Sequence, residues 1–330
     1  MGYDREVLQR ARRNYAEAVE AHRAQRLTQR LEICEELPEA AELEQKLRAT
    51  MAEVIAQSLR RGENPTEAID AIHRRNRSLQ EELRYLLEEN GYDANALEDT
   101  PMCPICRDSG YVGEKMCTCL AEFCRSEQKK ELTSLLSSNA TFDDFALDYY
   151  PTAVNPVTGL SPREQMEINY EFCVEYARHF RPGPDRNLLF NGAPGLGKTF
   201  LSACIAREVV DRSYSVVYDT AIHVFSCMEK QKFGGGTEED VRMAERILAC
   251  DLLILDDLGT EMSTAFIPSA LYTIINSRIL SEKPTIISTN YTIAQLSQRY
   301  TPQIASRLEG EYRLLPFAGS DIRKLKKEMF

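Results

Sequence analysis

The sequence predicts an α/β protein in which a parallel sheet flanked by helices follows an all-helical module and a small zinc-binding segment. Three observations support this organisation. Apolar residues recur at helical spacing over residues 3–90, five of the ten cysteines fall within residues 101–124, and short apolar runs alternate with helical stretches after Pro182. A chain of 330 residues is long for one average domain and comfortable for two.

The charge balance limits the classes of partner. A formal net charge of −11 argues against a protein that binds nucleic acid through bulk charge, although a local basic groove stays open. The clearest basic cluster, residues 322–330, is explained better as a solvated tail than as a binding patch. No apolar run approaches the roughly 18–20 residues that span a bilayer, and the charged N-terminus shows no secretory signal. We therefore expect a cytoplasmic protein without membrane contact.

Residues 1–95 are expected to form a helical module. The pattern predicts a first helix that ends at Pro38, a second over about 39–61 and a third over about 65–90, capped by Asn64. Such a module is either a self-contained bundle or a docking arm for a partner protein. The helical pattern alone leaves both interpretations open.

Residues 96–126 contain cysteines at metal-ligand spacing. Four thiolates can surround Zn²⁺ at about 2.3 Å when a short connecting loop brings two closely spaced cysteine pairs together. Residues 107–116 form that loop, and their two glycines allow a small hairpin. The four expected ligands are Cys103, Cys106, Cys117 and Cys119.

The metal site is expected to be structural. In a reducing compartment clustered cysteines are more often ligands than disulfides, and four thiolates leave no open coordination position for chemistry. Reduced structural cysteines are the alternative, and a redox pair is disfavoured because no βαβ unit begins here. Cys124 is either a substitute ligand or a core residue of the next helix. We interpret the segment as a clasp between the helical module and the domain that follows.

Residues 127–180 are expected to be a linker that leads into the domain of residues 181–330. In that domain buried parallel strands should alternate with helices. The apolar runs place these strands at residues 187–192, 215–220, 252–257 and 285–290.

Residues 192–199, GAPGLGKT, fit the phosphate-binding pattern G-x-x-x-x-G-K-[ST] between a strand and a helix. Backbone N–H groups of such a loop cradle the β-phosphate, and the following helix adds its positive N-terminal end. Lys198 would reach the β- and γ-phosphates of ATP, and the Thr199 hydroxyl would bind Mg²⁺. The expected nucleotide contacts are Gly192, Ala193, Pro194, Gly195, Leu196, Gly197, Lys198, Thr199 and Phe200.

Two acids follow the apolar run of LLILDDLG. Asp256, at the end of a buried strand, can hold the Mg²⁺ ion directly or through water. Asp257 is then a candidate to orient or deprotonate the attacking water. Asn290 ends the next strand and could position that water or sense the γ-phosphate, although on its own an asparagine in a turn after a strand is the better explanation.

These stretches, with IASRLEG after them, resemble the AAA+ ATPases of the bacterial replicative helicase loaders, the DnaC/DnaI-like group with an IstB-like ATP-binding domain. The similarity includes residues 141–150, TFDDFALDYY, whose aromatics in that family often pack near adenine. It also includes the cysteine-rich segment, and it covers about residues 95–323. The P-loop core of this fold class is expected here without the C-terminal helical lid of other AAA+ proteins.

The resemblance implies roles for individual residues. Lys198 and Thr199 match the Walker A pair, and Asp256 and Asp257 match the Walker B acids. Asn290 matches sensor 1. Arg307 takes the arginine-finger position, which reaches the nucleotide of a neighbouring subunit, so a homo-oligomer is implied when ATP is bound. Without the resemblance, a surface salt-bridge partner would be the preferred interpretation of Arg307.

The chain also departs from the family pattern. Many AAA+ proteins carry glutamate where Asp257 stands, so turnover is expected to be weak unless Glu261 assists. Arg323 is a candidate substitute for the missing lid arginine. In this family the region of residues 227–241 touches single-stranded DNA, and its Lys230, Lys232 and Phe233 offer charge and a stacking ring. A flexible surface loop accounts for the same residues equally well.

The resemblance therefore implies an ATP- and Mg²⁺-dependent switch that loads a hexameric, DnaB-type replicative helicase onto single-stranded DNA. In this interpretation residues 1–95 hold the helicase. An IS21-type transposase-helper ATPase is the alternative with the same core. A nucleotide-gated interaction protein with negligible hydrolysis is the alternative from another class.

Overall fold

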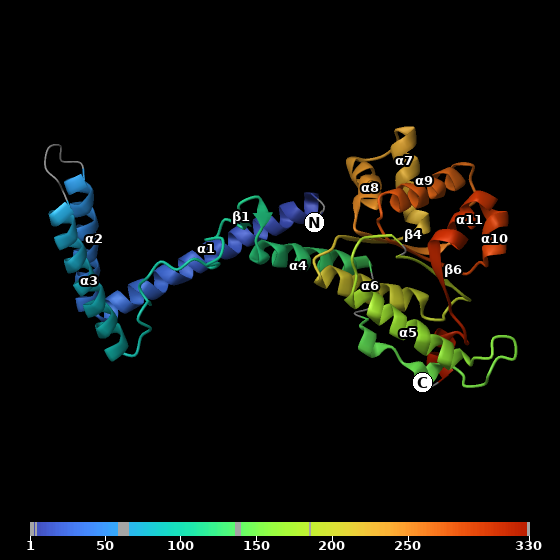
Figure 1. Ribbon diagram of the computed structural model, residues 1–330, viewed down its shortest axis with the longest axis horizontal. Coiled ribbons are helices and arrows are strands. Elements are labelled where there is room, and N and C mark those ends of the chain that lie inside the picture. Colours follow the sequence, from blue (N-terminus) through green and yellow to red (C-terminus); the bar gives the residue numbers. More distant parts are fainter. Residues whose placement is uncertain (1–2, 4, 59–65, 136–139, 185, 329–330) are drawn as a thin grey trace. The chain divides into compact units, whose positions relative to one another are not determined.

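The structure, a computed structural model, describes residues 3, 5–58, 66–135, 140–184 and 186–328 (Figure 1). The predicted cap Asn64 lies outside these residues. The chain divides into two compact units, one of Arg13–Cys119 and one of Met1–Arg12 with Leu120–Phe330. Within the described residues no helix combines the length and the apolar character that crossing a membrane requires.

Helices dominate the Arg13–Cys119 unit. Helix α1 (Arg5–Glu36) enters it at Arg13, and α2 (Pro38–Ser58) packs on α3 (Thr66–Glu89) beside the C-terminal end of α1. A small core of Ile33, Ala40, Leu87, Ala96 and Leu97 joins these helices to the segment after α3.

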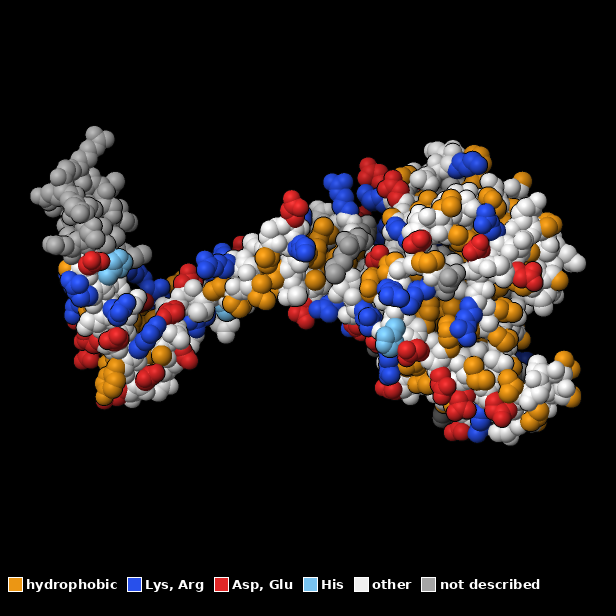
Figure 2. Space-filling model, viewed as in Figure 1, with side chains coloured by type: hydrophobic (Ala, Val, Ile, Leu, Met, Phe, Trp, Pro, Cys, Tyr) orange, Lys and Arg blue, Asp and Glu red, His pale blue; other side chains and the backbone are white. Residues whose placement is uncertain are grey.

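Large apolar side chains also lie at the surface of this unit (Figure 2). Leu27 and Leu31, one helical turn apart on α1, are 58% and 57% exposed, and Tyr85 on α3 is 67% exposed. Individual exposed apolar side chains are common on protein surfaces, so this exposure is compatible with a docking arm and with a self-contained bundle.

A short hairpin carries the cysteine-rich segment. Strand β1 (Tyr111–Val112) pairs with β2 (Lys115–Met116) in antiparallel register. Gly113 turns the hairpin with a φ of +60°, a left-handed conformation that glycine adopts without steric cost. Helix α4 (Thr118–Leu135) begins directly after β2.

A parallel sheet forms the centre of the second unit. Among the described residues it has five strands in the order β4-β5-β6-β3-β7. The strands are β3 (Asn187–Asn191), β4 (Val216–Thr220), β5 (Leu252–Leu258), β6 (Thr285–Thr289) and β7 (Tyr312–Pro316). The predicted α/β class is confirmed, and β3 to β6 lie at the apolar runs that predicted them.

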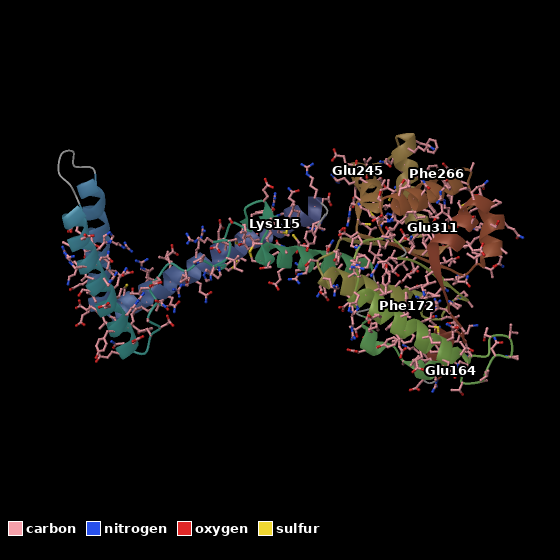
Figure 3. The ribbon with its side chains drawn as sticks, in the orientation of Figure 1. Lys115, Glu164, Phe172, Glu245, Phe266 and Glu311 are labelled. Carbon is pink, nitrogen blue, oxygen red and sulfur yellow. The ribbon has the colours of Figure 1, made fainter. Side chains whose placement is uncertain are left out.

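Strand β7 was not predicted. It lies at the edge of the sheet beside β3, where only Tyr312 and Leu315 of its side chains are buried. The Arg313 guanidinium stacks over the ring of Phe172, with 4.0 Å between its central carbon and the ring centroid (Figure 3). A half-exposed edge strand needs no continuous apolar run, so the sequence pattern gave no sign of it.

Helices cover both faces of the sheet. Leu188 and Ile254 face α5 and α6, whereas Leu189 and Leu255 face the helices on the other side. Because the central strands are buried on both faces, each carries a run of consecutive apolar residues, which is longest in β5. The helices are α5 (Pro162–Arg178), α6 (Lys198–Asp211), α7 (Ala221–Phe233), α8 (Glu238–Ala249), α9 (Phe266–Leu280), α10 (Ile293–Arg299) and α11 (Pro302–Glu311).

Helix α5 lies inside residues 127–180, which were predicted to be a linker and adenine-proximal segment. Ser161 begins it with a capping box, in which its hydroxyl accepts the Glu164 N–H and the Glu164 carboxylate accepts the Ser161 N–H (Figure 3). Met166 and Cys173 are fully buried against the sheet. The helix is therefore part of the core of this unit.

Candidate functional site

The loop between β3 and α6 is shaped by its glycines. Gly195 and Gly197 adopt left-handed φ values of +78° and +92°. A Cβ on Gly192 would lie 2.5 Å from the Phe317 carbonyl oxygen, and one on Gly195 would lie 1.9 Å from Asp321 Oδ1. The C-terminal segment therefore packs directly on the phosphate-binding loop, and it does so where the loop has no side chains.

Lys198 is buried at the start of α6. Its ammonium donates to the carbonyl oxygens of Gly192 at 2.6 Å and Ala193 at 2.9 Å, and to Asn290 Oδ1 at 2.7 Å. Burial lowers the pKa of Lys198, and the nearby Asp257 and Asp256 carboxylates oppose that shift. The ammonium is thus held in the loop by three oxygen acceptors, the type of ligand that a phosphate offers.

Asp256 lies at the centre of a hydroxyl network. Its Oδ2 accepts from the Thr199 hydroxyl at 3.0 Å and the Tyr218 hydroxyl at 2.9 Å, while Oδ1 accepts from the Ser288 hydroxyl. Motif reasoning missed Tyr218 and Ser288. Burial and the neighbouring Asp256 raise the pKa of Tyr218 well above its usual value, so that phenol stays a donor. A hydroxyl and a carboxylate in contact, Thr199 and Asp256, fit the residues that would hold Mg²⁺ beside a nucleotide.

Asp257 adopts an unusual backbone conformation. Its φ is +55°, in the left-handed region, and its N–H donates to Ser288 Oγ at 2.8 Å. Burial and the Asp256 carboxylate raise the pKa of Asp257, whereas Lys198 and Arg323 lower it. A non-glycine residue held in this region is often found at a functional site. Asp257 lines the same cavity as Lys198.

Glu261 does not reach this cavity. Its buried carboxylate accepts the Gly259 N–H at 2.8 Å and contacts Arg299 at 3.3 Å and Tyr300. These partners occupy the carboxylate oxygens. The suggestion that Glu261 assists hydrolysis therefore finds no support in the geometry.

A cavity of about 580 Å³ lies over the loop, and this volume is typical of sites for small ligands and cofactors. Aromatic side chains of the predicted adenine-proximal segment line it, namely Phe145, Tyr149 and Tyr150. The Tyr150 hydroxyl donates to the Leu196 carbonyl at 3.0 Å, and Phe145 stacks on Tyr150 with centroids 5.8 Å apart. Phe200, predicted to touch the nucleotide, lies on the same wall.

The basic C-terminal cluster also contributes to the cavity. Helix α12 (Ile322–Glu328) places Ile322, Arg323 and Lys326 on its lining. The Ile322 N–H donates to the Gly195 carbonyl at 3.0 Å, which ties the helix to the loop. Both basic side chains stay exposed, the Arg323 side chain by 74%, so they are solvated as predicted while they also line the cavity.

Arg307 lies elsewhere. On α11 it pairs with Glu311 at 3.7 Å, and it does not line the cavity. Arg307 is therefore placed away from the cavity of its own chain.

The predicted DNA-contacting residues separate into two groups. Lys230 pairs with Asp240 at 3.0 Å, and this hydrogen bond raises the pKa of Lys230. The charge of Lys230 is therefore already compensated. Phe233 is exposed and packs edge-on against Phe266 with centroids 5.8 Å apart, and the Lys232 ammonium lies 5.3 Å from the Phe266 ring (Figure 3). Phe266 was not identified from the sequence.

The sulfurs of Cys103, Cys106, Cys117 and Cys119 lie within 4.8 Å of one another. We refer to these four residues as the cysteine cluster. Its Cys103–Cys117 and Cys106–Cys119 sulfurs are 3.9 and 3.5 Å apart. A tetrahedron around Zn²⁺ has edges of about 3.8 Å when each sulfur lies about 2.3 Å from the metal, so the donor set fits zinc.

Cys124 lies outside the cysteine cluster. It is fully buried on α4, and burial raises the pKa of its thiol to about 11. Burial also raises the pKa of Cys119 to about 12. Burial likewise acts to raise the pKa of Cys106, but hydrogen bonds from Tyr15 and the Gly110 N–H outweigh it and lower the pKa to about 6. The geometry favours Cys124 as a core residue and leaves the four clustered cysteines as the ligand set.

Residues 183–309 match the family described as IstB-like ATP binding protein. The replicative helicase loader DnaC of Escherichia coli (strain K12) is 26% identical over 134 residues, 41% of this chain and 54% of that protein. The replicative helicase loader DnaI of Bacillus subtilis (strain 168) is 28% identical over 124 residues, 36% of this chain and 38% of that protein. A crystal structure of the DnaC helicase loader aligns with 22% identity and a TM-score of 0.44, over 55% of this chain and 97% of that chain. The matched region spans about half or less of the length of these two curated relatives.

Proposed function

We propose that the chain is an ATP-dependent loader of a hexameric replicative helicase, because residues 183–309 match the family described as IstB-like ATP binding protein and the chain carries the DnaC/DnaI-like motifs. It would place the helicase on single-stranded DNA and would act as a switch set by ATP and Mg²⁺. One observation supports the proposal most directly. Lys198 bonds to Asn290, and the Thr199 hydroxyl bonds to Asp256, at the same end of the sheet.

The described side chains suggest how ATP is held. The phosphates bind in the loop of residues 192–199. There the Lys198 ammonium exchanges its carbonyl acceptors for phosphate oxygens. The adenine lies against the aromatic wall that contains Phe145 and Tyr149. Mg²⁺, held by Thr199 and Asp256, supplies charge neutralisation for the phosphates.

Hydrolysis is expected to be slow. Asp257 is the candidate to orient or deprotonate the attacking water, and its raised pKa suits a base. Its side chain is one methylene shorter than a glutamate, which leaves a longer gap to the water. ATP therefore works mainly as a ligand whose binding favours one assembly state and whose hydrolysis releases it.

The position of Arg307 is the reason to propose a homo-oligomer. Because Arg307 lies away from the cavity of its own chain, it can act as an arginine finger only on the nucleotide of a neighbouring copy. Each complete site would then be shared between two copies, which would couple assembly to bound ATP.

Residues 1–95 are proposed to bind the helicase. The exposed Leu27, Leu31 and Tyr85 provide apolar surface of the kind that partner proteins cover. Single-stranded DNA is assigned to the surface of Lys232, Phe233 and Phe266, which combines a cation with stacking rings.

Two measurements test the proposal together. The zinc-loaded chain is assayed for ATP hydrolysis with and without single-stranded DNA, and for co-purification with the replicative helicase of its host. We expect slow turnover that DNA changes, and ATP-dependent association with the helicase that is lost when residues 1–95 are deleted. The variant Lys198→Ala is the control for nucleotide-dependent signals.

The alternatives give different results in the same experiments. Tight ATP binding without hydrolysis in either condition would instead identify a nucleotide-gated interaction protein. Association with a transposase in place of the helicase would identify a transposition helper, an alternative that the IstB-like match favours.

A further inference from the structure

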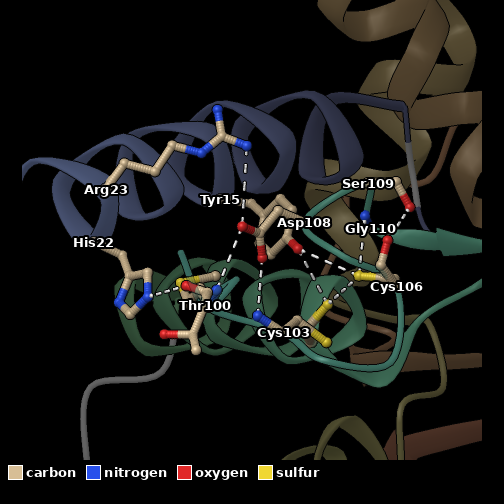
Figure 4. Close-up of polar contacts among 11 residues, drawn as sticks. Tyr15, His22, Arg23, Thr100, Cys103, Cys106, Asp108, Ser109 and Gly110 are labelled. Atoms are coloured by element: carbon tan, nitrogen blue, oxygen red, sulfur yellow. Dashed lines mark hydrogen bonds and ion pairs between the residues drawn. The ribbon is translucent and has the colours of Figure 1, made fainter. Parts of the chain in front are cut away.

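Tyr15 of α1 contacts the cysteine cluster from far away in the sequence. Its hydroxyl lies 3.5 Å from the sulfur of Cys106 and 3.4 Å from that of Cys119 (Figure 4). The ring is buried, with 6% of the residue exposed. We propose that Tyr15 is a positioning residue of the metal site, which donates its hydroxyl hydrogen to the metal-bound thiolates and thereby makes the docking of α1 depend on the metal.

The charge of the site calls for such a donor. Four thiolates around one Zn²⁺ leave two net negative charges, and the sulfurs, once bound to metal, can only accept hydrogen bonds. Donors to ligand sulfurs stabilise such a site and orient its ligands. The Gly110 N–H donates to Cys106 at 3.3 Å, and the Tyr15 hydroxyl is placed between Cys106 and a second ligand, Cys119. Tyr15 is thus the donor that reaches ligands on both sides of the hairpin.

The same face of α1 holds the chain that leads into the cluster. His22 Nε2 lies 3.1 Å from the Thr100 carbonyl oxygen (Figure 4), and Arg26 donates to the carbonyls of Ala96 at 3.0 Å and Glu98 at 2.8 Å. Tyr15, His22 and Arg26 are spaced by seven and four residues, which places them along one side of a helix. The contacts of Tyr15, His22 and Arg26 form a row of polar interactions along α1, which we call the polar seam, and the cysteine cluster lies at its Tyr15 end.

Asp108 strengthens the cluster end of the seam. Its carboxylate accepts the Cys103 N–H at 2.8 Å, and Arg23 of α1 lies 4.0 Å away (Figure 4). The hairpin beside it has only two residues in each strand, too few to be stable in water without help. The metal therefore supplies the rigidity that lets Tyr15 and Arg23 find fixed partners.

The first test measures zinc affinity on the full-length protein. Zinc is removed by competition with a chromogenic chelator from the wild type, from Tyr15→Phe and from Tyr85→Phe. Tyr85→Phe is the matched control, because it removes the same hydroxyl from an exposed ring on α3. We expect Tyr15→Phe to weaken zinc binding about 10-fold, the lower end of measured effects of such outer partners, and Tyr85→Phe to leave it unchanged. Equal zinc affinity in all three proteins would overturn the proposal.

A second readout does not depend on affinity. With Co²⁺ in place of zinc, the thiolate-to-cobalt charge-transfer band reports the electron density on the sulfurs. Tyr15→Phe should shift this band, since a thiolate that loses a hydrogen bond becomes a stronger donor. A spectrum identical to that of Tyr85→Phe would place Tyr15 outside the electronic reach of the metal and contradict the assignment.

Hydrogen exchange tests the coupling to α1. Chelation of zinc from the wild type should raise amide exchange in residues 13–26 more than in α3. In zinc-saturated Tyr15→Phe the same residues should already exchange faster than in Tyr85→Phe. If metal removal left residues 13–26 as protected as before, α1 would be held independently of the metal. This inference about the helical unit stands or falls separately from helicase loading.

Discussion

The Lys198 ammonium and the Asn290 amide oxygen are 2.7 Å apart, which joins the phosphate-binding loop to the end of strand β6. Lys198 is thereby oriented before any nucleotide arrives. The amide nitrogen of Asn290 is left available for a water or a phosphate oxygen on the same side. Lys198 begins α6, directly after the loop that follows β3, and Asn290 directly follows β6, so the contact links the ends of two neighbouring strands of the sheet.

Asn290→Ala should separate binding from turnover. Lys198 keeps its two carbonyl acceptors, so ATP affinity should change by no more than a few-fold. Hydrolysis should fall by about 100-fold, the usual cost of removing one preorganised donor. Steady-state turnover and nucleotide-binding titrations check this, with Lys198→Ala as the variant that should lose both. A loss of binding in Asn290→Ala equal to that in Lys198→Ala would contradict it.

Asp257→Asn should remove the base and stabilise the fold. We expect turnover to fall by about 10²–10⁴-fold, because a general base contributes that range. A base works only when deprotonated, and the pKa of Asp257 is raised by burial and by Asp256. The acid limb of the wild-type rate profile should therefore lie above the usual aspartate pKa of about 3.9.

The same shift predicts a pH-dependent gain in stability. A carboxyl whose folded pKa is raised binds its proton more tightly in the folded state, so ionising it costs stability above that pKa. Asp257→Asn should then melt at a higher temperature than the wild type at pH 8, and the difference should shrink as the pH falls through the pKa. A gain that did not vary with pH would point to a cause other than titration.

Arg278 is expected to be a major contributor to stability. It is fully buried and donates to the Thr285 hydroxyl at 2.9 Å and to the carbonyls of Ile247 at 2.8 Å and Pro284 at 2.7 Å. Arg278→Met leaves these buried acceptors unpaired and should cost about 3–5 kcal/mol in urea unfolding. Arg178→Met, on an exposed face of α5, should change the free energy of unfolding by no more than about 0.5 kcal/mol.

Arg323→Ala should weaken ATP binding. Arg323 lines the cavity, whereas Lys324 beside it does not. We expect the dissociation constant for ATP to rise about 5-fold or more, because a cation near the phosphates is lost, and Lys324→Ala to leave it unchanged. Fluorescent-nucleotide titrations at equal ionic strength compare the two. Equal effects of both variants would show that α12 acts only through its net charge.

Phe233→Ala should weaken binding to single-stranded DNA by about 5- to 100-fold, as expected for one stacking ring. Phe266→Ala should do the same, since the rings pack on each other. Lys230→Ala is the control from the same helix and should have little effect, because Asp240 already pairs with that ammonium. Anisotropy of a labelled oligonucleotide at low salt measures all three. A strong loss in Lys230→Ala would assign the contact to the charge instead.

Features set by local motifs were predicted well from the sequence, and features set by packing were not. The loop around Lys198 and the strand that carries Asp256 follow from residue spacing and apolar runs. Tyr218 and Ser288 belong to no motif: a polar residue inside a strand acquires its role only when sheet order places it next to Asp256. Strand order is a tertiary property, so single-strand patterns could not reveal these partners.

The C-terminal part of the chain shows the same limit. The helix that brings Arg323 to the cavity is short and highly charged, which in isolation is typical of a solvated tail. Its position is set by the Gly195 carbonyl and by β7, an edge strand with few buried side chains. Prediction also missed Tyr15, since helical periodicity marks it as a buried position without indicating what it contacts.

The close approach of Gly192 to the Phe317 carbonyl affects how loop variants are read in experiments. A Cβ at Gly192 would force the Phe317 backbone to shift, and the segment that begins with Phe317 also brings Arg323 to the cavity. Such a variant would lose nucleotide binding even if every phosphate contact of the loop survived. Glycine substitutions in this loop are therefore poor reagents for abolishing nucleotide binding selectively, and Lys198 is the position at which to make that substitution.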